Sequence, residues 1–258
     1  MCGIAGAFLR PHVRLDANAA VQRMCNRMRA RGPDAAGDWS DPNGRCVLGH
    51  RRLSIIDPDP RSNQPMTSED GRFVIVLNGE IYNYVELRRD LERRGCVFRT
   101  GSDTEVMLEL LSRDGVGAVE RLRGMFAFAL WDKEALTLSL GRDPYGIKPL
   151  YFADTEAGVL FASQVKALTA SGVIPQTIDR PESPVFFCGA VSPSLSPSMT
   201  RLRRSRPEAL SQSALAGRRV SLTTPIYRGF GSSRPRGSAR IGWVTGFVKA
   251  SLTRCAPI

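Results

Sequence analysis

The chain has 258 residues, 42% of them hydrophobic, which is enough for one large domain or two smaller ones. Its formal net charge is +11, but residues 1–180 hold 24 Lys and Arg against 23 Asp and Glu, so the basic excess lies in the C-terminal part. No stretch approaches the roughly 18 consecutive apolar residues of a membrane span, and the N-terminus lacks the features of a signal peptide. We therefore expect a cytoplasmic protein with no membrane partner.

The cysteines form no recognisable framework. They include no CxxC motif and no Cys/His spacing typical of a metal site, so we expect neither disulfides nor a bound metal. The six are Cys2, Cys25, Cys46, Cys96, Cys188 and Cys255.

The first 178 residues show interleaved signals for short strands and helices. Apolar runs of strand length are found at 4–9, 72–77, 125–131, 137–140 and 158–162. Stretches with helical character cover 17–28, 84–94 and 103–112. Gly95 and Gly115 are placed to end the second and third helices, and Ser102 or Asp103 to cap the third. Strands in one block with helices packed over them predict a layered α+β fold of the αββα type.

After Asp179 the character of the sequence changes. Residues 181–258 hold 12 Lys and Arg against two acidic residues, Glu182 and Glu208, and show no clear helix or strand period. We expect residues 179–258 to form a mostly disordered basic tail. A nucleic-acid-binding arm is the alternative, but the tail lacks regularly spaced aromatic residues, so we do not expect nucleic acid as a partner.

Cys2 follows the initiator methionine and is itself followed by small residues, Gly3, Ala5 and Gly6. Small residues here permit enzymatic removal of Met1, which would make Cys2 the N-terminal residue. An N-terminal cysteine can use its own α-amine, with a pKa of about 7.7–8.0, as general base for its thiol. The chain has only two histidines, so few residues could serve as the base of a Cys–His pair. Cys2 is therefore the candidate nucleophile.

Seven motifs then occur in order along the chain. They are RGPD at 31–34, GHRRLSIID at 49–57, QPM at 64–66, NGEIYNY at 78–84, TGSDTEV at 100–106, GMFAFAL at 124–130 and RDPYGIKPLY at 142–151. Each motif alone is weak evidence, whereas their joint order is specific. In this order the chain resembles the class II glutamine amidotransferase domain, an N-terminal-nucleophile (Ntn) hydrolase fold, and within that class the glutamine-hydrolysing asparagine synthetases. The resemblance covers about residues 2–178.

The resemblance implies a role for each residue of a glutamine pocket. Glutamine carries an α-carboxylate, an α-ammonium and a side-chain amide, so a selective pocket needs a cation, an anion and an oxyanion hole. Arg52 matches the family residue that binds the α-carboxylate, a task that suits a guanidinium. Glu80 and Asp103 match the acceptors for the α-ammonium, and the Asn78 side chain and the Gly79 N–H match the oxyanion hole. The backbone groups of the residues that follow Arg52 should line the same pocket, namely those of Leu53, Ser54, Ile55 and Ile56.

The implied reaction has two steps. The Cys2 thiolate attacks the glutamine amide and releases ammonia, and water then hydrolyses the thioester, with no metal or organic cofactor. Complete asparagine synthetases use the ammonia in a further domain with a Ser-Gly-Gly-x-Asp loop, where ATP and Mg²⁺ act. This chain contains no such loop, so we expect that domain to be absent. Gln164 stands where the family has a glutamate that contributes to contacts with that domain.

The tail also carries a frame-dependent signal. Most amino acids have several codons, and the codons for residues 185–213 can be chosen so that a shifted reading frame encodes a different sequence. That sequence resembles the asparagine synthetase segment that follows the glutaminase domain. We therefore interpret residues 179–258 as an out-of-frame remnant of the linker to the missing domain, with the frameshift near residues 181–184. A catalytically idle truncated remnant stays open as an alternative to an active glutaminase, and so does a homodimer.

Overall fold

The computed structural model describes residues 1–174, 219–223, 240–243 and 247–253. These residues build two antiparallel sheets and the helices that cover them. Sheet A has the strand order β11-β8-β9-β1-β3-β2, and sheet B has the order β10-β12-β7-β6-β5-β4.

Sheet A is built around β1 (Gly3–Leu9), which pairs with β3 (Cys46–Arg52) on one side and β9 (Gly158–Ala162) on the other. The outer neighbours of these strands are β2 (Ala35–Ser40) and β8 (Tyr151–Asp154). Because side chains alternate along a strand, β1 contributes to two cores. Ile4 and Phe8 pack between the sheets, whereas Ala5, Ala7 and Leu9 pack on the helix side.

Sheet B is built on β5 (Phe73–Ile81), which pairs with β6 (Gly124–Asp132) along its whole length. A hairpin then leads from β6 to β7 (Thr137–Arg142), and both strands were predicted from the apolar runs at 125–131 and 137–140. On the other side, β4 (Met66–Thr67) pairs with β5 only at Ile75 and Val74. Beyond Ile75 the outer edge of β5 therefore has no strand partner among the described residues.

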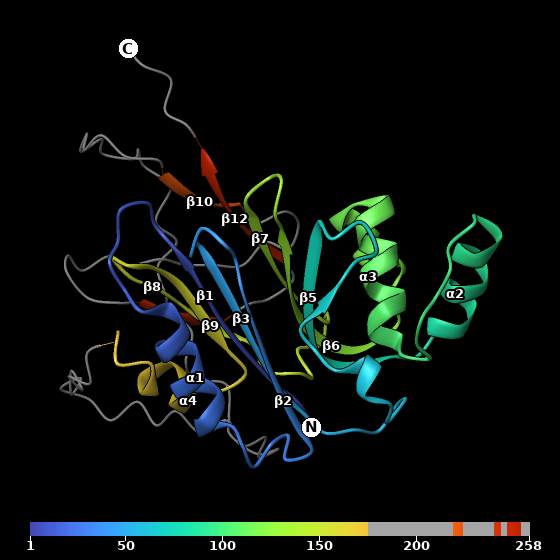
Figure 1. The fold of residues 1–258 in the computed structure, drawn as a ribbon, viewed down its shortest axis with the longest axis horizontal. Helices are drawn as coiled ribbons and strands as arrows, with labels where there is room; N and C mark the ends of the chain where they lie inside the picture. The colour runs from blue at the N-terminus through green and yellow to red at the C-terminus, as the bar shows by residue number, and fades with distance from the viewer. Residues whose placement is uncertain (175–218, 224–239, 244–246, 254–258) are drawn as a thin grey trace, which may run out of the picture. The chain divides into compact units, whose positions relative to one another are not determined.

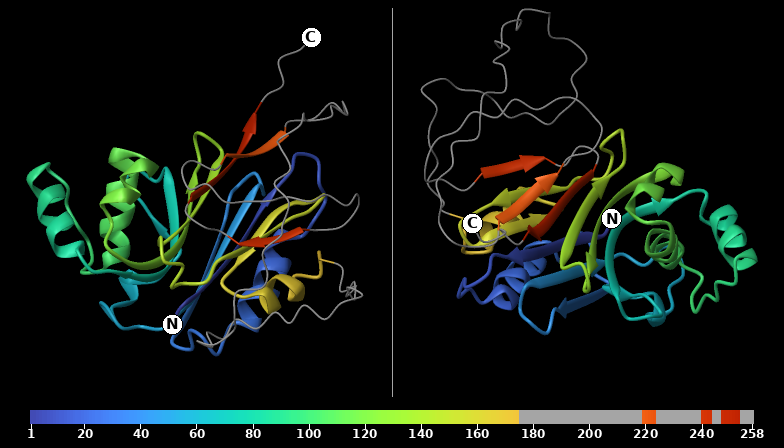
Figure 2. Two further views of the ribbon diagram at one scale, coloured as in Figure 1. Left: turned by 180° about the vertical axis from the view of Figure 1, so that it is seen from behind. Right: turned by 90° about the horizontal axis from the view of Figure 1, so that it is seen from above.

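Helices cover the outer faces of both sheets. The helices α1 (Ala17–Arg27) and α4 (Val165–Ala170) lie on sheet A, and α3 (Asp103–Asp114) lies on sheet B with α2 (Tyr84–Arg93) beyond it (Figure 1). The same separation of α1 from α2 and α3 is visible from above in Figure 2. The layer between the sheets includes the rings of Phe8 and Trp131, whose centroids are 5.5 Å apart. The predicted αββα architecture is confirmed.

The helix ends follow the local sequence signals. Gly95 and Gly115, with φ of 82° and 77°, lie just beyond α2 and α3, in the left-handed region that glycine adopts without steric cost. The Ser102 hydroxyl accepts from the Glu105 N–H at 3.2 Å and caps α3, which leaves the Asp103 carboxylate for another contact. Several elements were not predicted: β2, β3, β4, β8, α4 and the short 3₁₀ helices η1 (Pro60–Ser62) and η2 (Val116–Arg121).

Three strands fall within the segment that we expected to lack order. They are β10 (Arg219–Thr223), β11 (Arg240–Trp243) and β12 (Phe247–Thr253), of which β12 pairs with β7 and β10, and β11 with β8. The sequence of β12 alternates apolar and polar residues, with apolar side chains at Val248, Ala250 and Leu252. This alternation is typical of a strand, and the prediction of a disordered tail from its composition missed it. The rest of 179–258 lies outside the described residues, and the domain division at residue 178 stays a prediction. No helix in the described part of the chain is long and apolar enough to cross a membrane.

Candidate active site

A cavity of about 220 Å³ lies where β1 begins and β5 ends. Its walls come from segments far apart in the sequence: the start of the chain, the end of β3, the end of β5 and the start of α3. Every predicted pocket residue lines it except Ser54, whose N–H instead donates to the Asp34 carboxylate at 2.8 Å. The lining residues that the sequence did not single out for this role are Met1, Ser62, Gln64, Leu77, Ser102, Thr104, Met125 and Lys148.

Cys2 directly precedes β1 and is half-buried at the cavity wall. Its Sγ lies 3.4 Å from the Leu53 nitrogen and 3.6 Å from the Leu53 oxygen. The Nε–H of Arg31 donates to the Cys2 carbonyl at 3.0 Å. These contacts hold both the backbone and the sulfur of Cys2 against the end of β3.

The other described thiols are buried away from this cavity. Burial raises the pKa of Cys25 and of Cys96 to about 11, and it raises the pKa of Cys46 well above the usual value. At neutral pH these three thiols stay protonated and unreactive. Among the described cysteines, Cys2 is the one that lines the cavity.

The open edge of β5 presents every second peptide group to the side away from β6. The Leu77 nitrogen lies 2.5 Å from Oε1 of Gln64, and the Ile81 nitrogen lies 2.9 Å from Oδ2 of Asp103. Strand alternation places the Gly79 N–H between these two on the same edge. No acceptor among the described residues takes up the Gly79 N–H, so it is available to a ligand. A Cβ at this position would lie 2.3 Å from the Met125 oxygen, which leaves room for glycine alone.

The side chain of Asn78 points into the layer between the two sheets. Its side chain is only 1% exposed, and its Nδ2 has no acceptor in the part of the chain that the structure describes. Such donors are rare, because leaving one buried without a partner costs about 1–3 kcal/mol. Asn78 and Gly79 thus line the same cavity as Cys2, each with a donor that has no acceptor among the described residues, an arrangement that suits the stabilisation of an oxyanion.

Arg52 is 5% exposed, and its guanidinium faces the segment that follows β3. Its Nη1 donates to the Asp59 oxygen at 3.1 Å and to Oδ1 of Asn63 at 2.7 Å, and its Nη2 donates to the oxygens of Ile56 at 3.4 Å and Asp57 at 2.5 Å. The terminal nitrogens of Arg52 therefore already have acceptors. A carboxylate that binds there has to replace some of these neutral oxygens, and the greater strength of charge-assisted hydrogen bonds favours that exchange.

Asp57 connects the segment around Arg52 to the start of α3. Its Oδ2 accepts from the Ser62 hydroxyl at 2.7 Å and from the Gly101 N–H at 2.6 Å. These hydrogen bonds, that of Ser62 foremost, lower the pKa of Asp57 and keep its carboxylate charged. Asp57 thereby couples the loop that holds Arg52 to the residues next to Asp103.

Two carboxylates form the acidic side of the cavity. Asp103 is the first residue of α3 and is 5% exposed, and Glu80 lies near the end of β5. Burial raises the pKa of Asp103, and the charge of Glu80 adds to the rise. An ammonium group bound between the two carboxylates would reduce the cost of burying the Asp103 charge and the repulsion between Asp103 and Glu80. This side of the cavity therefore suits a cationic ligand group.

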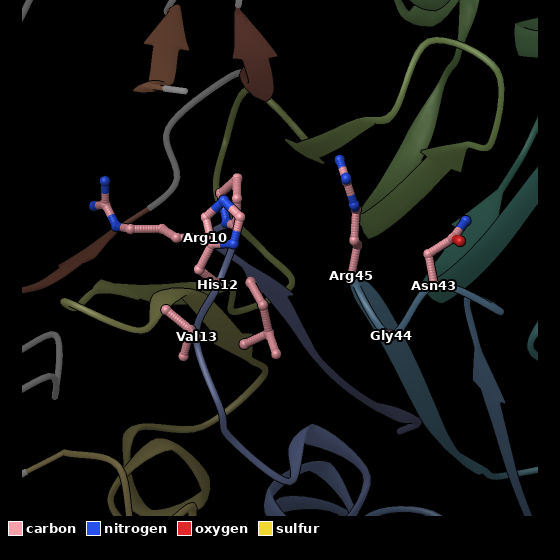
Figure 3. A pocket seen from close by; sticks show the side chains of 8 residues that line it. Arg10, His12, Val13, Asn43, Gly44 and Arg45 are labelled. Carbon is pink, nitrogen blue, oxygen red and sulfur yellow. The ribbon is translucent and has the colours of Figure 1, made fainter. Parts of the chain in front are cut away.

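Neither histidine lines this cavity. The larger cavity, of about 560 Å³, contains His12 and lies at the opposite end of β1 from Cys2. Figure 3 shows Asn43 and Arg45 on one side of it, and Arg10, His12 and Val13 on the other. Arg10 is already paired with the carboxylate of Asp154 at 2.8 Å, and Arg45 stands on the other side of the cavity. No group of three or more metal-ligating side chains occurs in the described ranges.

A family model for the glutamine amidotransferase domain matches residues 1–213. The chain belongs to this family. Its membership confirms the resemblance seen in the motifs and the predicted class of enzyme, an amidotransferase. The match extends past residue 178, into the part of the chain that we expected to be a tail.

Several curated relatives of this glutamine amidotransferase domain are named as asparagine synthetases. The chain is 43% identical over 170 residues to asparagine synthetase [glutamine-hydrolyzing] 1 of Bacillus subtilis, which covers 65% of this chain and 26% of that protein. It is 40% identical over 169 residues to asparagine synthetase B [glutamine-hydrolyzing] of Escherichia coli, covering 65% of this chain and 30% of that protein. The chain therefore spans less than a third of the length of these relatives.

Solved structures confirm the fold. Glutamine phosphoribosylpyrophosphate amidotransferase from B. subtilis, in complex with ADP and GMP, aligns with a TM-score of 0.57 and 21% identity, over 67% of this chain and 44% of that one. The structure of the allosteric regulatory enzyme of purine biosynthesis aligns with a TM-score of 0.58 over 66% and 43%. These alignments confirm the predicted α+β fold class for the N-terminal region.

Proposed function

We propose that this domain hydrolyses L-glutamine to glutamate and ammonia through a thioester on Cys2. The observation that carries the proposal is the position of Cys2 on the same cavity as two free donors, the Asn78 amide and the Gly79 N–H. Donors of this kind stabilise the oxyanion of acyl transfer, and loss of one typically costs about 10²–10³ in rate. The family and the names of the relatives support glutamine as the substrate.

We assign the general base to the α-amine of Cys2, exposed by removal of Met1. Met1 is 55% exposed and lines the cavity, so its removal enlarges the space beside Cys2 at little cost in buried contacts. The amine, with an ordinary pKa of about 7.7–8.0, takes the thiol proton and passes it to the departing ammonia. In the second step it takes a proton from water, which attacks the thioester, and returns it to the sulfur. An intact-mass measurement of the purified protein should show that Met1 is absent.

Recognition of glutamine is assigned to the two charged sides of the cavity. The α-carboxylate replaces the Ile56 and Asp57 oxygens at Nη2 of Arg52, and the α-ammonium lies between Glu80 and Asp103. This orientation points the side-chain amide of glutamine toward Cys2 and the oxyanion hole. Both charged ends of the amino acid are thereby paired, which a cavity of this size and polarity requires.

The ammonia is proposed to serve asparagine synthesis. Relatives that are 40–43% identical carry that name, but this chain spans less than a third of their length, so the acceptor is assigned to a part of those proteins that this sequence does not match. ATP and Mg²⁺ are assigned to that part of the protein alone. The glutaminase step uses only the residues described above.

Ammonia release from glutamine tests the proposal directly. The full-length protein should release ammonia, and Cys2→Ala should release none above background. Cys25→Ala is the matched control, because it removes a thiol that lies outside the cavity and should keep the wild-type rate. Equal release by wild type and Cys2→Ala would sink the proposal, and a folded wild type without activity would favour the idle remnant.

A further inference from the structure

Leu77, the residue before the two oxyanion donors, is held by side chains where a neighbouring strand is missing. Because β4 stops pairing with β5 at Ile75, the N–H and C=O of Leu77 face an open edge. The Leu77 N–H donates to Oε1 of Gln64 at 2.5 Å, and Nε2 of His50 lies 3.1 Å from the Leu77 oxygen. Both backbone groups of Leu77 are thus satisfied by side chains from other segments.

The contact of His50 crosses from one sheet to the other. His50 lies on β3 of sheet A, where it pairs in register with Ile4 of β1, two residues after Cys2. Leu77 lies on β5 of sheet B, directly before Asn78. One hydrogen bond therefore joins the strand beside the nucleophile to the strand that carries the oxyanion donors.

The donor and acceptor roles in these contacts are defined by chemistry. A carbonyl oxygen only accepts, so Nε2 of His50 carries the proton. The His50 ring is 1% exposed, and burial lowers its pKa to about 4, which keeps it neutral. The Gln64 Nε2 donates to the Thr104 hydroxyl at 3.1 Å, which leaves its Oε1 to accept from Leu77. Both side chains are held in the one orientation that satisfies the Leu77 peptide groups.

We propose that His50 and Gln64 are positioning residues of the oxyanion hole: they replace the missing strand at Leu77 and set where the next two residues stand relative to Cys2. The inference rests on the proposed hydrolysis of glutamine. His50 does not line the cavity, so it acts on the substrate through other residues, and the Leu77 oxygen is the group that its Nε2 contacts. A misplacement of about 1 Å in such a site can cost about 10² in rate, so two hydrogen bonds at this point have a large effect.

The test compares the full-length wild type with His50→Leu and His50→Gln. A glutamine side chain can place an amide N–H where the His50 Nε2 lies, whereas leucine cannot. We expect His50→Leu to lower kcat for ammonia release about 10- to 100-fold with KM changed less than about threefold, and His50→Gln to recover most of the rate. Gln64→Met keeps the side-chain length but removes the acceptor, and it should lower kcat in the same way.

A transition-state mimic separates positioning from a merely structural role. The aldehyde analogue of glutamine forms a tetrahedral adduct with the Cys2 thiolate, so its affinity should fall in proportion to kcat in His50→Leu, while the binding of glutamate stays unchanged. Leu138→Ala is the control for lost stability, because Leu138 is buried between the sheets at the end of β7 away from the cavity. It should keep the wild-type kcat per folded molecule.

These outcomes decide between the two proposals. Wild-type kcat in both His50→Leu and Gln64→Met overturns the positioning inference, and so does a loss in kcat that Leu138→Ala reproduces. A wild-type protein that releases no ammonia overturns the proposed function instead. An aldehyde affinity that stays constant while kcat falls also counts against positioning.

Discussion

Acidification should weaken the fold through His50, and the size of the effect follows from its burial. Burial lowers the pKa of His50 from 6.5 to about 4, so between these pH values the ring is protonated in the unfolded chain and neutral in the folded chain. The neutral ring therefore stabilises the folded state fully above pH 6.5, and its contribution is lost as the pH falls toward 4. At about 1.36 kcal/mol per pKa unit, the whole loss is about 3 kcal/mol, of which about 2 kcal/mol falls between pH 7 and pH 5.

Urea unfolding at about pH 7 and about pH 5 measures this loss. On acidification, His50→Gln should lose about 2 kcal/mol less than the wild type, because glutamine does not titrate. His12→Gln is the matched control, since His12 is the other histidine and is exposed, and it should follow the wild type. Carboxylates titrate alike in all three proteins and cancel in the differences. Equal losses in the wild type and in His50→Gln would refute the argument that the fold keeps this ring neutral.

Four further predictions follow from the site and the tail. Gly79→Ala forces a Cβ to within 2.3 Å of the Met125 oxygen, so kcat for ammonia release should fall at least about 100-fold at equal folded fraction. A smaller loss would contradict the assignment of the Gly79 N–H to the oxyanion hole. Arg52→Lys keeps the charge but loses the planar guanidinium, so steady-state kinetics should show KM for glutamine raised about 10-fold or more with a smaller change in kcat; an unchanged KM would contradict the assigned carboxylate contact. Iodoacetamide at neutral pH should label Cys2 ahead of the three buried thiols, and glutamine should slow the labelling, as peptide mass mapping can show; equal labelling of all four would count against the site. In a shifted frame, the coding DNA beyond codons 175–215 should continue into a Ser-Gly-Gly-x-Asp loop, and a frame without it would end the frameshift interpretation.

The elements with strong local signals were predictable from the sequence. The second and third helices end at glycines with positive φ, and the serine before the third helix caps it, because these features depend on neighbours within a few residues. The hairpin of β6 and β7 and the strand β9 also follow from local apolar runs. In each case the local preference and the tertiary environment agree.

The strands that the sequence did not predict depend on contacts from distant segments. β2 has the sequence AAGDWS, with low strand propensity, and it forms because it pairs with β3. β3 ends in two arginines, which is unusual for a strand in the middle of a sheet. Arg51 donates to the Cys25 oxygen and to Asn26 at the end of α1, while Arg52 donates to the opposite side, so each charge finds partners outside the strand.

The chemistry of the site was readable from the sequence, but its geometry was not. Residue types and motif order determined that this chain carries a glutamine amidotransferase domain with Cys2, Arg52, Asn78, Gly79 and Asp103 as its candidate groups. Only the tertiary structure decided that Ser54 lies outside the cavity and that Asp103 binds the edge of β5. It also decided that Cys2 and Asn78 line one cavity, because they come from two different sheets. Which face a strand residue presents follows from local alternation, whereas which faces meet depends on how the two sheets pack.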